Sequence, residues 1–193
     1  MLARTTLREA RPALIPLALG LLAIVAMACA TDVEVETDAL ECYSGGMPAS
    51  AEARGSIELG WGTGDFRPIE PDQTLTLKPG PASPHYFEIQ TRIADLEPGN
   101  AEDRDDASNP HTLLSVFDEA GDQVDRGVCG FSLPYRPDGE STYTVESWRQ
   151  LTVSPEFVQE ADGARVRLVA EIVDAEGGYA RDEVWVTVEV EDL

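Results

Sequence analysis

Lysine is almost absent from the sequence, and basic residues in general are few. The 193 residues include 14 Lys and Arg against 36 Asp and Glu, a formal net charge of −22, and Lys78 is the one lysine. Without residues 1–28, which contain three Arg and one Glu, 11 basic and 35 acidic residues remain, a net charge of −24. Such a surface repels phosphate groups, so it excludes nucleic-acid binding and the docking of a basic patch on anionic lipids.

Groups that carry the common enzyme chemistries are also scarce. The chain has two histidines, His85 and His111, and contains no Gly-x-Ser-x-Gly nucleophile motif, phosphate-binding loop or dinucleotide-binding fingerprint. We interpret His85 as a residue at the edge of the core and His111 as the start of a strand. Pairs of carboxylates suited to glycoside hydrolysis arise by chance among so many acidic residues and indicate nothing. We therefore expect no enzyme activity and no cofactor.

A long apolar run occurs once, near the N-terminus. Arg4, Arg8 and Arg11 precede fifteen residues from Leu14 to Ala28 that carry no charge and end in small residues. This layout is typical of a secretory signal peptide, which we predict as a helical segment over residues 1–28. The run is shorter than the roughly 18 residues of a membrane-spanning helix, and no later segment approaches that length.

The residues Ala26-Met27-Ala28-Cys29 at the end of this run resemble the lipobox of bacterial lipoproteins. In that family the cysteine becomes the lipidated first residue, so the resemblance implies a lipid anchor at Cys29. Ala30 rather than Asp at the next position implies the outer membrane. Ordinary cleavage after Ala28 or Ala30 is the alternative, because both sites follow the small-x-small rule, and it predicts a soluble periplasmic or secreted protein.

The chain has two further cysteines, Cys42 and Cys129. If Cys29 is acylated, they form an even pair in an oxidising compartment, and we expect a disulfide between them. This bridge would close a loop of 87 positions. On the chain-entropy argument it would stabilise the fold by at most about 4–5 kcal/mol. A metal site at these cysteines would need more ligands nearby, and the chain has only His85 and His111.

From residue 53 onward, hydrophobic and polar residues alternate with period two, which is typical of antiparallel strands with one buried face. The predicted strands cover residues 56–61, 74–78, 86–93, 113–117, 131–135, 142–145, 149–153, 165–172 and 183–190. One short helix is expected over 155–161, with Ser154 as its cap and Pro155 in its first position. The sequence therefore predicts a flexible acidic tether over 29–52 and one antiparallel β-sandwich domain over 53–193.

The last two predicted strands suggest a specific hairpin register. If Leu168 lies opposite Val188, the alternating apolar residues of both strands share one face. The same register places Arg167 opposite Glu189 and Arg165 opposite Glu191, which are favourable cross-strand pairs.

Residues 163–190 resemble the closing strands of immunoglobulin-like extracellular β-sandwich modules, through an alternating strand, an Asp-Ala-x-Gly turn and a Val-alternating final strand. The segments 62–68, Gly-Thr-Gly-Asp-Phe-Arg-Pro, and Gly80-Pro81 before His85 resemble segments of uncharacterised secreted lipoproteins of Gram-negative bacteria. The resemblance implies an immunoglobulin-like fold and a cell-envelope address. We expect a non-enzymatic envelope protein whose module has a structural role or binds an unknown protein or glycan. A carbohydrate-binding module is the first alternative, and a secreted hydrolase is the second.

Two groups of residues are weak candidates for a binding site. Asp103 and Asp105 have the alternate spacing of calcium ligands, but Ala107 stands at the next alternate position and no Gly follows, so we favour a solvated acidic loop. In the predicted register Trp185 lies on the polar face of the last strand beside Glu171, and Trp148 precedes Arg149. Exposed Trp residues stack on sugars or bind proteins, so both are possible ligand-stacking residues, although Trp185 packing against an Arg side chain is the simpler interpretation.

Overall fold

The computed structural model describes residues 52–80, 85–126, 129–145 and 149–191. The predicted signal peptide, Cys29, Cys42, Trp148 and the tether as far as residue 51 lie outside the described residues, as does the side chain of Cys129. The lipid anchor and the disulfide therefore stay predictions. Within the described residues, no helix has the length and apolar character needed to cross a membrane.

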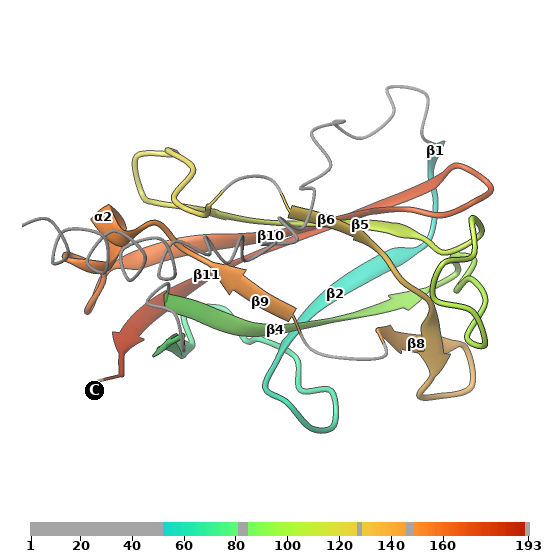
Figure 1. Cartoon of the computed structure of the whole chain (residues 1–193), viewed down its shortest axis with the longest axis horizontal. Coiled ribbons are helices and arrows are strands. Elements are labelled where there is room, and N and C mark those ends of the chain that lie inside the picture. Colours follow the sequence, from blue (N-terminus) through green and yellow to red (C-terminus); the bar gives the residue numbers. More distant parts are fainter. Residues whose placement is uncertain (1–51, 81–84, 127–128, 146–148, 192–193) are drawn as a thin grey trace, which may run out of the picture. The chain divides into compact units, whose positions relative to one another are not determined.

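The described chain consists mostly of β-strands and contains almost no helix, which confirms the expected all-β class (Figure 1). In chain order the strands are β1 (Glu52–Ala53), β2 (Ser56–Trp61), β3 (Thr74–Pro79), β4 (His85–Ala94), β5 (His111–Phe117), β6 (Cys129–Ser132), β7 (Tyr135–Pro137), β8 (Thr142–Val145), β9 (Arg149–Thr152), β10 (Arg165–Val173) and β11 (Gly178–Val190). Helix α2 (Pro155–Val158) is shorter than predicted but begins as expected, because Ser154 Oγ accepts a hydrogen bond from the backbone N–H of Phe157.

The strands form two hydrogen-bonded groups that share β3. One group has the order β6-β5-β10-β11-β3, and the other has the order β3-β4-β8-β7, with β2 and β9 also paired to β4. In Figure 1, β5, β6 and β10 lie in one layer and β4, β8 and β9 in the other. The prediction of a purely antiparallel sheet is wrong, because β1 and β3 both run parallel to β11. Period-two alternation indicates which face of a strand is buried but not the direction of its neighbour.

The two groups also meet at the edge away from β3. There the segment 123–126 pairs with both, since Val124 N–H donates to the carbonyl of Val116 in β5 and Arg126 N–H donates to the carbonyl of Thr152 in β9. The side chain of Asp125 is buried in this junction and accepts a hydrogen bond from the backbone N–H of Val116 at 2.8 Å. Burial raises the pKa of Asp125, although the hydrogen bond from Val116 N–H opposes this shift.

The core contains the alternating apolar residues of both groups, as the period-two pattern predicts. Its largest fully buried side chains are Leu59, Leu77, Phe87, Ile89, Ile93, Val116, Val153, Val166, Leu168, Ile172, Val186 and Tyr135. Both histidines begin strands, as predicted: His85 is the first residue of β4 and His111 is the first residue of β5.

Tyr135 is the one aromatic hydroxyl among these fully buried side chains, and it links the two strand groups. Its hydroxyl lies 2.8 Å from Thr91 Oγ1 of β4 and 2.8 Å from Thr112 Oγ1 of β5. Burial raises the pKa of Tyr135 to about 12, so the phenol is neutral and able to donate one hydrogen bond and accept the other. The three hydroxyls therefore satisfy one another inside the core.

Replacing Tyr135 with Phe should lower the free energy of unfolding by about 1–3 kcal/mol, because two buried threonine hydroxyls lose their shared partner. Chemical denaturation of the wild type and the variant measures this difference. Tyr143→Phe is the matched control, because the side chain of Tyr143 is only half-buried. Equal stability of Tyr135→Phe and wild type would contradict a role for the hydroxyl triad.

The closing hairpin has the predicted faces but a different register. Leu168 pairs with Val184 and Val166 pairs with Val186, a shift of four residues from the expected pairing. Arg167 is therefore opposite Trp185 rather than Glu189, and Arg165 is opposite Thr187 rather than Glu191. An even shift keeps every apolar residue on its predicted face, so hydrophobicity does not distinguish the two registers.

The turn before β11 explains the shift. Asp174 Oδ1 accepts hydrogen bonds from the backbone N–H groups of Glu176 and Gly178, and Asp174 N–H donates to the carbonyl of Gly178. This tight turn brings residues 178–182 into β11, whereas the prediction began that strand at residue 183.

A second difference from the prediction concerns the strand expected over residues 131–135. The structure breaks it into β6 and β7, which lie on either side of Leu133 and Pro134. Proline has no N–H for a central sheet position.

Candidate functional site

The structure places Trp185 in the middle of β11, with its ring in contact with arginines. The guanidinium carbons of Arg165 and Arg167 lie 5.0 Å and 5.8 Å from the centroid of the Trp185 ring, and Trp185 is half-buried. Arg167 also lies over the ring of Phe117, and Arg165 pairs with Asp72 at 2.5 Å. A sugar that stacked on Trp185 would have to displace an arginine. The partner expected beside Trp185, Glu171, lies opposite Arg181 instead.

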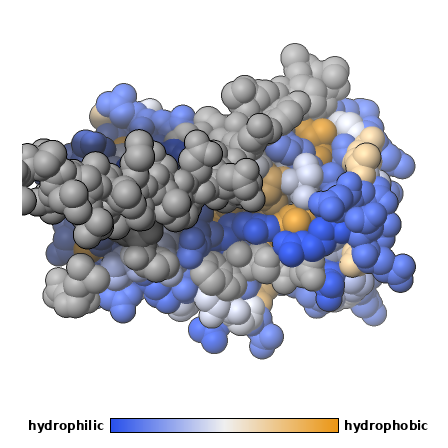
Figure 2. Space-filling model, in the orientation of Figure 1, coloured by the Kyte–Doolittle hydropathy of each residue, from blue (hydrophilic) through white to orange (hydrophobic). Residues whose placement is uncertain are grey.

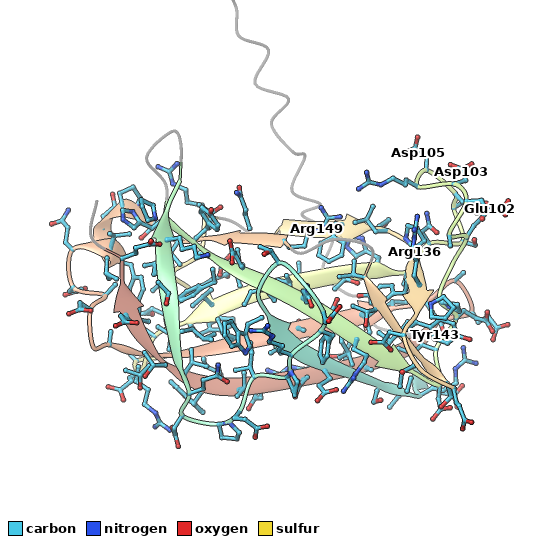
Figure 3. The ribbon with its side chains drawn as sticks, turned by 90° about the horizontal axis from the view of Figure 1, so that it is seen from below. Glu102, Asp103, Asp105, Arg136, Tyr143 and Arg149 are labelled. Atoms are coloured by element: carbon cyan, nitrogen blue, oxygen red, sulfur yellow. The ribbon has the colours of Figure 1, made fainter. Side chains whose placement is uncertain are left out.

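The acidic loop of Glu102, Asp103 and Asp105 projects from one end of the strands (Figure 3). The carboxylate of Asp103 serves the loop itself, because its Oδ1 accepts a hydrogen bond from Asp105 N–H at 3.0 Å. The buried Asn109 side chain donates to the carbonyls of Asp103 and Arg104. In the part of the chain that the structure describes, no three metal-ligating side chains come together. Hydrogen bonding within turns accounts for this loop.

A groove on the outer face of β4 brings together polar side chains from distant parts of the sequence. Its volume is about 700 Å³, within the range of small-molecule sites. Loop 62–66 forms one wall, β4 forms the floor, and β7, β8 and the turn between them form the other wall. The lining residues are Thr63, Gly64, Asp65, Phe66, Gln90, Arg92, Arg136, Pro137, Asp138, Thr144 and Val145.

The loop wall is positioned because the chain folds back on β2 after Trp61. Trp61 N–H donates to the carbonyl of Arg67, and Ile69 N–H donates to the carbonyl of Leu59. The ring of Phe66 then lies against Gly60, where a Cβ atom would come within 2.4 Å of Phe66 Cε2. Gly60 is therefore required for the close approach of the loop to the sheet.

The floor of the groove consists of the polar face of β4. Gln90 is 5% exposed, and its Nε2 donates to the carbonyl of Gly64 at 2.8 Å, while its Oε1 has no hydrogen-bond partner among the described residues. The guanidinium of Arg92 lies 4.3 Å from the centroid of the Phe66 ring and donates from Nε and Nη2 to Glu58. Arg92 thus contributes a cation and an orienting contact for the loop wall.

Asp138 is the acidic group of the opposite wall, and its carboxylate is held by hydroxyl groups. Oδ1 accepts a hydrogen bond from Thr142 Oγ1 at 2.6 Å, and Oδ2 accepts one from Thr144 Oγ1. Partial burial would raise the pKa of Asp138, but these two hydrogen bonds and nearby Arg92 hold it below its ordinary value. Asp138 is therefore an oriented, ionised acceptor at neutral pH. Arg136 projects from β7, at the same end of the strands as Tyr143 (Figure 3).

Sequence reasoning identified parts of this groove without assembling them. The predicted strand 86–93 includes Gln90 and Arg92, and the segment 62–68 was singled out for its resemblance alone. Arg136 and Asp138 carried no signal, since an exposed Arg and a turn Asp are ordinary surface residues. None of the predicted site residues, Trp185, Asp103 or Asp105, lines the groove.

No known protein family matches the chain, and no curated protein or solved structure is significantly similar to it. The resemblance to secreted lipoproteins stays a prediction.

Proposed function

We propose that the chain is an exported, lipid-anchored protein of the cell envelope that presents a non-enzymatic, immunoglobulin-like binding module, with the groove on β4 as its ligand site. The observation that carries this proposal is the convergence of Phe66, Gln90, Arg92 and Asp138 on one groove from three separate segments. Ligand sites typically combine a concave surface with a few oriented polar groups. On the face drawn in Figure 2, the described surface is mostly hydrophilic, with a few hydrophobic patches.

The strand order supports the immunoglobulin-like part of the proposal. In that fold the first, second and fifth strands are neighbours in one sheet, and the third, sixth and seventh strands are neighbours in the other. The neighbours β3-β4-β9 match the first set, and β5-β10-β11 match the second. Strands β1 and β2 are additions before this arrangement, and β6, β7 and β8 lie at or near its edges.

Binding rather than catalysis is favoured by the state of Asp138, which lines the groove together with Asp65. A glycosidase needs a carboxylic acid with a raised pKa to protonate the leaving group. The pKa of Asp138 is lowered instead, because its carboxylate accepts two hydroxyl hydrogen bonds. Such a group suits a permanent acceptor for a bound ligand.

The lipid anchor has its own test. With Cys29 acylated, the native protein should incorporate labelled palmitate and partition into the detergent phase. Cys29→Ser should lose both properties, because the hydroxyl cannot become the thioether that carries the lipid. A Cys29→Ser variant that stays equally membrane-associated would contradict anchoring at this residue.

The groove is tested by filling it. A Cβ atom at Gly64 meets no heavy atom within 4 Å, so Gly64→Trp should occupy the groove without disturbing the fold. Immobilised full-length wild type should retain material from solubilised envelope extract that Gly64→Trp fails to retain. Glu119→Trp, in an exposed turn outside the groove, is the control and should behave as wild type.

Retention of the same material by Gly64→Trp would show that the groove is not the binding site. Conversion of retained material into smaller products would contradict the non-enzymatic part of the proposal and favour the hydrolase.

A further inference from the structure

The groove holds both signs of charge together with uncharged polar groups, and this mixture restricts its ligand. Arg92 and Arg136 line it together with Asp65 and Asp138. An anionic ligand that approached the arginines would meet both carboxylates. It would also approach a chain whose net charge is −22. A basic peptide would be attracted by the whole molecule but would meet two arginines in the groove itself.

The carboxylate of Asp138 is suited to accept hydrogen bonds from adjacent hydroxyl groups. Thr142 and Thr144 each donate to one of its oxygens and so fix its orientation. Each carboxylate oxygen accepts about two hydrogen bonds, so each retains a position for a further donor. Two neighbouring acceptors in a fixed plane match a pair of neighbouring hydroxyls on a polyol.

The floor supplies a second acceptor and a donor. Gln90 Oε1 has no partner within the described residues although its side chain is 95% buried, and an unpaired buried amide oxygen is costly. The Nε2 hydrogen bond to Gly64 holds the loop above it, so a small shift of that loop would let a hydroxyl donate to Oε1. Among the described residues Arg92 donates from Nε and Nη2 to Glu58, and because a guanidinium has five N–H groups, others remain to donate to a ligand oxygen.

We infer that the groove takes a neutral polyhydroxylated ligand, a stretch of uncharged glycan, in preference to an anionic glycan or a basic peptide. Asp138 accepts from neighbouring hydroxyls, Arg92 donates to a hydroxyl or ring oxygen, and Gln90 accepts from a hydroxyl that enters beneath the loop. The partly exposed Phe66 ring adds an apolar edge for the C–H groups of a sugar. This inference rests on the proposed function, because it names the ligand class of the same groove.

The test is calorimetric titration of the full-length exported protein with hexasaccharides of glucose, mannose, galactose and N-acetylglucosamine, and with hexagalacturonate and hexalysine as charged comparators. At least one neutral hexasaccharide should bind saturably, with a Kd of about 1 mM or tighter. Its affinity should change little between low salt and about 0.5 M salt, because no ion pair forms with the ligand. The two charged probes should not bind at the groove.

Two groove variants and two controls locate the binding. Asp138→Asn should weaken the affinity for the neutral hexasaccharide by about tenfold or more, because a hydrogen bond to a charged acceptor is lost. Gly64→Trp should abolish binding. Asp122→Asn, which changes an exposed turn aspartate outside the groove, and Glu119→Trp should bind as wild type. Circular dichroism of all four variants should match wild type.

Absence of binding by every neutral hexasaccharide, or unchanged binding in both groove variants, overturns the inference. The retention experiment with envelope extract separates this failure from that of the proposed function. If Gly64→Trp loses retained material while neutral hexasaccharides do not bind, the ligand class is wrong and the groove remains a binding site. If Gly64→Trp loses nothing in either experiment, both proposals fall.

Discussion

Replacing Val186 with Asp should leave the domain largely unfolded under conditions in which the wild type is folded. Val186 is 0% exposed and pairs with Val166, which is also 0% exposed, in the centre of the closing hairpin. An ionised carboxylate at this position would have no partner among apolar side chains, at a cost of several kcal/mol. The total stability of a typical domain is about 5–15 kcal/mol. Urea denaturation followed by circular dichroism measures the loss.

Glu189→Gln is the matched control on the opposite face of the same strand. Glu189 is exposed, so its replacement should change the free energy of unfolding by roughly 0.5 kcal/mol or less. Leu168→Asp should behave like Val186→Asp, because Leu168 is 0% exposed on the neighbouring strand. If Val186→Asp folded as well as Glu189→Gln, the faces of β11 would be assigned wrongly.

Replacing Asp174 with Ala should cost about 3 kcal/mol or more. The Asp174 side chain is 0% exposed and joins three parts of the chain. Its Oδ2 accepts from Arg54 Nη2 at 2.8 Å and from Glu97 N–H at 3.0 Å, and its Oδ1 accepts from Glu176 and Gly178 in the turn before β11. Alanine would leave three backbone N–H groups without their acceptor. Asp174→Asn should cost less, because an amide oxygen preserves the two hydrogen bonds of the turn.

The pH dependence of stability should identify the charged form of Asp174 as the stabilising one. Burial alone would raise its pKa, but Glu97 N–H, Arg54 and Gly178 N–H together hold the pKa below its ordinary value. A lowered pKa in the folded state contributes stability above the unfolded-state pKa of about 3.9, and this contribution is lost as the pH falls through the folded-state value. The stability difference between wild type and Asp174→Asn should therefore narrow on acidification from neutral pH.

Urea denaturation of both proteins at several pH values checks this narrowing. The pKa of Asp125 is shifted in the opposite direction, because burial raises it and protonation relieves the cost of burying the charge. The stability difference between wild type and Asp125→Asn should therefore not narrow on acidification. A difference between wild type and Asp174→Asn that stayed constant with pH would indicate that the carboxylate charge is not involved.

The fold was predictable to the extent that it depends on local pattern. Strand β2 was predicted at its observed bounds, and the buried positions of β4, β10 and β11 followed from alternation. The hairpin register was not predictable, because an even shift preserves the faces and the decisive hydrogen bonds belong to the Asp174 turn. The parallel pairing of β3 with β11 joins residues more than one hundred positions apart, beyond the reach of a local pattern.

The groove was less predictable than the fold, since its walls meet only after folding. Gln90 stands at a polar position of an alternating strand, which indicates exposure, yet it is 5% exposed because the loop after β2 lies over it. Asp138 looks like any turn aspartate until the two threonine hydroxyls are seen on its carboxylate. Charge and periodicity indicate whether each residue is exposed or buried, whereas a ligand site depends on several residues that meet only after folding.

If the protein is anchored by its N-terminus, as we propose, the parallel pairing of β3 with β11 has a mechanical consequence. The start of β3 and the end of β11 lie at opposite ends of their pair, since Thr74 pairs with Thr187 and Leu77 with Val190. A pulling force between the two ends of the domain would therefore act along these strands and load all the hydrogen bonds of the pair together in shear. It would not break them one after another. Under such a load, the rupture force of the domain would depend on the short parallel ladders that β1 and β3 form with β11, so two proteins of equal unfolding free energy could differ widely in rupture force.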